Sequence, residues 1–192
     1  MEPWLSFYLR HFASRKEAED FVQACENLQP SAQNHVAKIM MHQTQRLVSI
    51  ADDLPQFRPH KEPLQVLFLA MCSENIAKLH DGFSGEGKSR HYVQQFFNKF
   101  LSQSDKDALS YGFNVNIDLL PSIGFGKAVS LLYDIRCDVV HEGNYTDFAF
   151  HDGHMSMVNT DPDVIAEIQL VQIRDIVVRG CINAVKDKLS NA

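Results

Sequence analysis

The stretch from Phe125 to Tyr145 constrains the fold more than any other part of the chain. Its apolar residues recur at intervals of three and four, which places them along one side of an α-helix; they are Ala128, Leu131, Leu132, Ile135 and Val139. Gly143 is a natural end for this helix, because glycine adopts the left-handed conformation at low cost. The sequence therefore predicts a largely buried helix with Arg136 and His141 close to its C-terminal end.

Helical periodicity extends over most of the remaining chain. The predicted helices cover residues 3–12, 14–28, 31–54, 64–80, 89–101 and 104–111. A last helix is expected to begin at Asp161-Pro162, an N-cap and a first-turn proline, and to run to about residue 189. Residues 112–123 are expected to be irregular or to form a short helix.

Residues 147–158 depart from the helical period. Polar residues alternate there with apolar ones, which are Phe148, Phe150, Met155 and Met157. Asp152-Gly153 lies between them, as is typical of a β-hairpin with a tight turn. We therefore expect an all-α fold, an antiparallel bundle of five to six helices, with a small β-hairpin insertion near residues 147–158.

Length and composition favour one domain over residues 1–192, with residues 1–30 as an N-terminal helical extension. No apolar run reaches the length of a membrane span or a signal peptide, so no membrane partner is expected. The four cysteines are far apart, as in a reduced cytoplasmic protein. The net charge of −6 argues against a general nucleic-acid-binding surface, so an RNA site would have to be a local basic spot.

Arg136 and His141, in an apolar helix that ends at a glycine, resemble the R-x4-H signature of HEPN domains. The resemblance covers about twenty residues closely and the order of helices loosely. It implies a HEPN-like helical domain that forms a homodimer, and many members of the family are metal-independent ribonucleases. Family nucleases usually have Asn, Asp or His directly after the arginine, where this chain has Cys137.

The two residue types suit phosphodiester cleavage. Histidine exchanges protons near neutral pH, and arginine offers a fixed fork of donors to a phosphate. The resemblance implies that His141 is the acid–base group and Arg136 the phosphate clamp, in a cleft shared by two protomers. An RNA 2′-hydroxyl would attack its own phosphate and leave a cyclic phosphate, with no metal or other cofactor.

Three further residues are candidates for supporting roles. By analogy with an acidic residue on an earlier helix of the family, Glu74 is expected to orient Arg136. Asp138 lies three residues before His141, within reach of its ring, and Cys137 occupies the position that is usually polar. On an α-helix, Arg136 and His141 would be about 140° apart around the axis and about 7.5 Å apart along it, so they would not share one face.

Two functions remain open from the sequence. One is a HEPN-type metal-independent endoribonuclease, acting as a toxin or an antiviral effector. The other is a non-catalytic HEPN-like module that binds a nucleotide, an antitoxin or another protein. Arg136 and His141 could also have purely structural roles at the helix end, where a positive charge is favourable. No metal site is predicted, although His151 and His154 beside the hairpin turn leave that question open.

Overall fold

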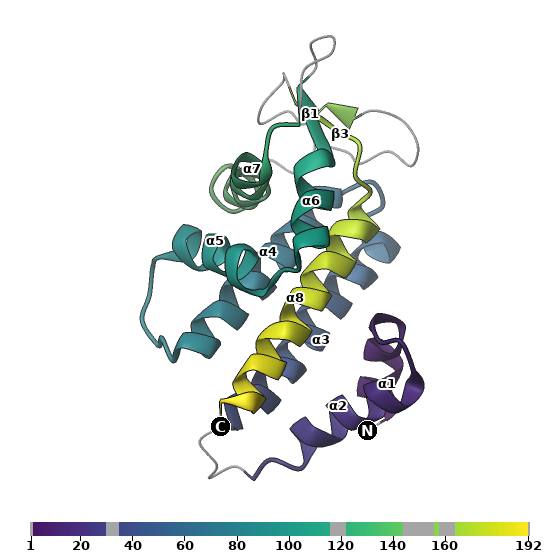
Figure 1. Ribbon diagram of the computed structural model, residues 1–192. Coiled ribbons are helices and arrows are strands. Elements are labelled where there is room, and N and C mark those ends of the chain that lie inside the picture. Colours follow the sequence, from purple (N-terminus) through teal and green to yellow (C-terminus); the bar gives the residue numbers. More distant parts are fainter. Residues whose placement is uncertain (1, 30–34, 116–121, 144–155, 158–163, 192) are drawn as a thin grey trace.

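The computed structural model describes residues 2–29, 35–115, 122–143, 156–157 and 164–191. These residues are mostly helical, as the periodicity predicted, and they also contain a small antiparallel sheet (Figure 1). The α-helices are α1 (Glu2–Tyr8), α2 (Arg15–Glu26), α3 (His35–Phe57), α4 (Glu62–Asp81), α5 (Ser89–Phe100), α6 (Gln103–Tyr111), α7 (Phe125–Cys137) and α8 (Leu170–Ser190). The described residues thus form eight α-helices, and the expected count of five to six is not confirmed.

Helices α3, α4 and α8 form the centre of the molecule. Helix α8 lies alongside α3 and α4, while α5 and α7 lie on the side of α4 away from the N-terminal helices (Figure 1). Helix α4 is apolar on nearly all sides and is buried at Val66, Leu69, Cys72 and Ile76, as expected for a central helix. No helix in the described residues has the length and apolarity needed to cross a membrane.

The N-terminal helices α1 and α2 are joined by a 3-10 turn, Leu9–His11, and pack against this centre. The Tyr8 side chain is almost fully buried, and its hydroxyl donates a hydrogen bond to the carbonyl of Met41, 2.7 Å away. Ser14 caps α2, because its hydroxyl oxygen accepts a hydrogen bond from the Glu17 amide. The predicted start of this helix is therefore confirmed.

The sheet joins strands from the two sides of α7 in the sequence. Strand β3 (Val164–Ala166) lies between β1 (Phe113–Val115) and β2 (Ser156–Met157), with Phe113 opposite Ala166. The predicted start of the last helix is wrong over β3, whose β-branched residues pair with β1 instead. Helix α8 begins later, where the side chains of Gln169 and Gln172 form a capping box.

The predicted hairpin lies mostly outside the described residues, including its expected turn at Asp152-Gly153. Two of its residues, Ser156 and Met157, do form a strand. In the described part of the chain that strand pairs with β3, which follows it in the sequence. Residues 113–115 were expected to be irregular or helical and instead supply the opposite edge of the sheet.

Candidate functional site

Arg136 and His141 lie on α7 and on the short π-helical segment that continues it. The α-helix ends at Cys137, and residues Asp138–Glu142 form the π-helical segment. Gly143 ends it in the left-handed conformation, with φ of 67°, and its amide donates to the Asp138 carbonyl five residues earlier. Glycine is thus the stop that the sequence predicted, in a conformation that other residues adopt at a cost.

The π-helical segment changes the expected relation between Arg136 and His141. Hydrogen bonds between residues five apart make a wider turn than those of an α-helix. Residues five apart are therefore closer to the same face than the 140° separation of an ideal α-helix would give. His141 is exposed at this end, and within the described ranges no hydrogen bond or ion pair joins it to Arg136.

Glu74 lies next to Arg136, in the arrangement that the sequence analysis expected. One carboxylate oxygen is 3.7 Å from the Arg136 guanidinium. The other accepts a hydrogen bond from the Ser89 hydroxyl at 2.8 Å and is 2.7 Å from the Lys78 ammonium. We call Glu74, Lys78, Ser89 and Arg136 the Glu74 cluster. Lys88 holds the N-cap position of α5, and the side chain of Ser89, the first residue of this helix, binds Glu74.

The Arg136 guanidinium is held in place but retains free donors. Its side chain is only 18% exposed, and its contact with Glu74 is longer than a hydrogen bond. No hydrogen bond connects it to any other residue that the structure describes. Since arginine carries five N–H donors, this group is available to an incoming anion.

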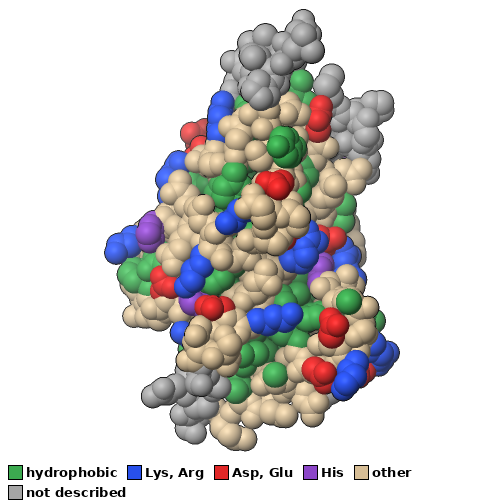
Figure 2. All heavy atoms as spheres, viewed as in Figure 1, with side chains coloured by type: hydrophobic (Ala, Val, Ile, Leu, Met, Phe, Trp, Pro, Cys, Tyr) green, Lys and Arg blue, Asp and Glu red, His purple; other side chains and the backbone are tan. Residues whose placement is uncertain are grey.

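Tyr133 lies between two guanidinium groups at the edge of the Glu74 cluster. The guanidinium carbon of Arg90 is 4.7 Å from the centre of the tyrosine ring, and that of Arg136 is 5.7 Å away. Arg90 also pairs with Asp134 at 2.5 Å. Lys78, Arg90 and Arg136 thus gather three cations beside two carboxylates, those of Glu74 and Asp134. Elsewhere, positive and negative side chains are interspersed over the face drawn in Figure 2.

Cys137 and Asp138 lie where the α-helix changes into the π-helical segment. The Cys137 thiol interacts with the Tyr133 side chain; burial, followed by this thiol, raises the pKa of Tyr133. Burial, together with the charges of Glu142 and Asp134, raises the pKa of Asp138. Among the described residues, no ion pair joins Asp138 to His141. The wider π-type turn explains this, because it moves residues three apart out of line.

A second polar assembly, which the sequence analysis did not identify, surrounds Arg174 on α8. Its guanidinium donates to both Asp52 oxygens at 3.1 and 2.8 Å, and to His11 and Asp175 at 3.0 Å each. Arg10 pairs with Asp175 at 2.5 Å. We call these five residues the Arg174 network. An arginine within the apolar stripe of a helix was the signal for it, because a buried charge requires partners.

His11 is neutral in this network. Its side chain is almost fully buried, and burial lowers its pKa to about 4, which the nearby Arg174 charge reinforces and Asp175 opposes. A neutral imidazole accepts at one nitrogen only. Since Nε2 accepts from Arg174, the proton of His11 is on Nδ1.

The described residues contain no group of three or more histidine, cysteine or acidic side chains placed to hold a metal ion. His151 and His154 lie outside the residues that the structure describes, so the question of a metal there is unchanged. The cysteines are free thiols: Cys25, Cys72 and Cys181 are buried, whereas Cys137 is partly exposed.

The chain was compared with protein-family models, curated proteins and solved structures. No family model matches the chain, and neither a curated protein nor a solved structure does.

Proposed function

We propose that the protein is a HEPN-type, metal-independent endoribonuclease with Arg136 and His141 as its catalytic residues. The observation that carries this proposal is the Arg136 guanidinium, which is fixed beside Glu74 while its donors have no hydrogen-bond partner among the described residues. A phosphate that receives two of these donors would be held in a defined orientation. The exposed His141, five residues further along on the π-helical segment, would exchange the protons of the reaction.

The Glu74 cluster supports the proposal by fixing the clamp without neutralising it. Glu74 also pairs with Lys78, so two cations share one buried carboxylate. One positive charge therefore remains within this cluster, while the neighbouring Arg90 is paired with Asp134. An RNA site on an acidic protein requires such a local excess of positive charge.

A homodimer is part of the proposal, because the resemblance to HEPN domains implies that two protomers bring two Arg136 and His141 pairs together. Val140 precedes His141 and is 48% exposed, so the π-helical segment presents an apolar side chain to solvent. A second copy that covers this residue would bring two pairs together. Light scattering would test this: the expected mass is twice 21.8 kDa for the native chain and 21.8 kDa for Val140→Asp.

The activity is tested with single-stranded and structured RNA in the presence of EDTA. Replacing the acid–base group by His141→Asn is expected to slow cleavage by about a hundredfold or more, the usual contribution of such a group. The matched control is His60→Asn, which removes another exposed histidine in the loop between α3 and α4. Cleavage that EDTA abolishes, or that both variants preserve, would contradict the proposal.

A non-catalytic binding module is the second candidate, favoured by one observation. The Cys137 thiol, at the position that is usually polar, interacts with Tyr133, a residue of its own helix. In that case the protein would bind a nucleotide or a protein partner such as an antitoxin through Arg136 and would not turn it over. A folded chain that binds a nonhydrolysable RNA analogue but cleaves no RNA would select this function.

A further inference from the structure

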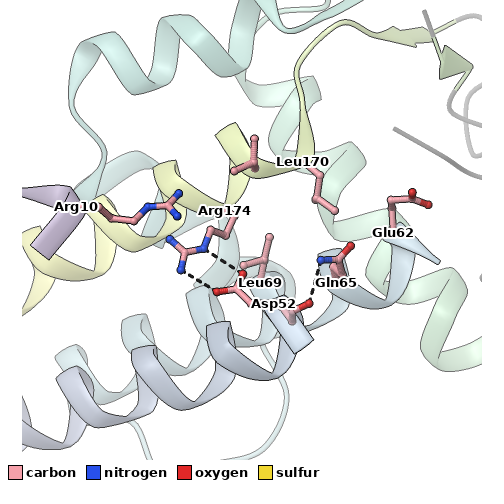
Figure 3. Close-up of a pocket in the computed structure, with 9 residues that line it drawn as sticks. Arg10, Asp52, Glu62, Gln65, Leu69, Leu170 and Arg174 are labelled. Atoms are coloured by element: carbon pink, nitrogen blue, oxygen red, sulfur yellow. Dashed lines mark hydrogen bonds and ion pairs between the residues drawn. The ribbon is translucent and has the colours of Figure 1, made fainter. Parts of the chain in front are cut away.

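A pocket of about 350 Å³ opens where the 3-10 turn, α3, α4 and α8 meet, beside the Arg174 network (Figure 3). Its apolar lining comes from Ala51, Leu69, Leu170 and Val171. Its size falls within the range of small-molecule sites, and its wall combines apolar surface with a few polar groups, as such sites do. We propose that this pocket binds a small organic cation, an amine or guanidinium on a short aliphatic body.

The first argument is the state of Glu62. Its Oε2 atom is buried and has no hydrogen-bond partner within the described residues. A buried carboxylate oxygen without a donor is costly. Because Oε2 is shielded from solvent, a ligand reaches it only when the Glu62 side chain turns into the pocket, and its donor then supplies the hydrogen bond that the free protein lacks. Gln65 lies three residues further along α4, and its amide nitrogen donates to Ala51, which leaves its oxygen as another acceptor.

The second argument is that the cations of the pocket are already paired. Arg174 uses its donors on Asp52, Asp175 and His11. Asp52 nevertheless keeps 40% of its side chain exposed, so its carboxylate still faces solvent. The pocket lining carries two guanidinium groups, those of Arg10 and Arg174, and two carboxylates, those of Asp52 and Glu62. Both guanidinium groups are paired, whereas Glu62 Oε2 has no donor among the described residues. The unmet polar group of the pocket is therefore an acceptor, which favours a ligand that donates hydrogen bonds and carries a positive charge.

The third argument is the order of these groups. Figure 3 shows Arg10 at one end of the pocket and Glu62 at the other, with Asp52, Gln65 and Arg174 between them. A cation at the Glu62 end is therefore remote from the half-exposed Arg10 guanidinium. Leu69 and Leu170 lie between the ends and would contact the aliphatic body.

The test uses agmatine, which carries an amine and a guanidinium on one aliphatic chain, and glutarate, a dicarboxylate of similar length. Binding to the full chain is measured by calorimetry in phosphate buffer, because Tris is itself an amine. We expect saturable binding of agmatine and none of glutarate. We expect Glu62→Gln to weaken agmatine binding by about tenfold or more, the effect of losing a hydrogen bond to a charged group.

Two more variants make the result specific to this pocket. Glu86→Gln changes an exposed carboxylate in the loop between α4 and α5, and it should leave agmatine affinity unchanged. Val171→Trp adds bulk at a half-exposed residue of the pocket rim and should abolish binding without unfolding the protein. Absence of agmatine binding, equal binding of glutarate, or equal effects of Glu62→Gln and Glu86→Gln would overturn the proposal.

Discussion

At the scale of single residues, Arg136 and Arg174 show two uses of an arginine in an apolar helix. Both side chains are largely buried, at 18% and 10% exposed. Arg174 makes four hydrogen bonds, whereas Arg136 makes none to the residues that the structure describes. Arg174 therefore stabilises the fold, and Arg136 is available for an anion.

This contrast predicts that the same substitution destabilises the protein to different extents at the two positions. Arg174→Lys keeps the charge but loses most of the hydrogen bonds, so it should lower the free energy of unfolding by about 2–3 kcal/mol. Arg136→Lys should lower it by less than about 1 kcal/mol, because only a long ion pair is altered. Urea unfolding of the two variants measures both values. A larger loss for Arg136→Lys would show that its donors are already used in the fold.

At the scale of elements, the π-helical segment after α7 is the feature that sequence periodicity did not reveal. The apolar stripe predicted the helix and Gly143 predicted its end, and both are confirmed. Periodicity assumes a constant turn, so it could not predict a change from α to π geometry after Cys137. The strand at Val164–Ala166 was missed for a related reason, since its partner, β1, lies about fifty residues away in the sequence.

Substitutions of Gly143 test how much the stability of the π-helical segment depends on the glycine that ends it. Its φ of 67° is strained for alanine, so Gly143→Ala should lower the free energy of unfolding by about 1–2 kcal/mol. Gly143→Asn is the matched control and should cost less, because asparagine adopts this conformation more readily. Equal stability of the two variants in chemical unfolding would mean that the segment rearranges when its glycine is replaced.

At the scale of the whole molecule, the N-terminal helices are tied to the centre by polar contacts as well as by apolar packing. The Tyr8 hydroxyl reaches Met41 on α3, and His11 and Arg10 join the Arg174 network. The sequence predicted the helices of residues 1–30, because their periodicity is local. It could not predict these ties, since they join residues more than thirty to about 160 positions apart.

The buried His11 makes the stability of the whole molecule depend on pH. The unfolded chain takes up a proton on this residue near pH 6.5, whereas the folded protein keeps it neutral down to about pH 4. The unfolded state therefore binds more protons in this window, and the free energy of unfolding should fall by about 3 kcal/mol as the pH drops through it.

His11→Gln keeps a side-chain acceptor for Arg174 but cannot be protonated in this range. Its stability should therefore depend less on pH between 6.5 and 4 than that of the native chain, as measured by urea unfolding at several pH values. Parallel curves for the two proteins would show that His11 has no part in the acid sensitivity.

The unequal burial of the four cysteines has a practical consequence. Burial raises the pKa of Cys25 to about 12. The hydrogen bond with Cys181, followed by burial, raises the pKa of Cys72, and Cys181 is itself buried. A thiol-reactive dye should therefore label the native protein once, at Cys137, and the denatured chain four times. Cys137 adjoins Arg136, so the fluorescence of a dye on this thiol should change when a ligand binds at Arg136. No engineered cysteine is needed for this measurement.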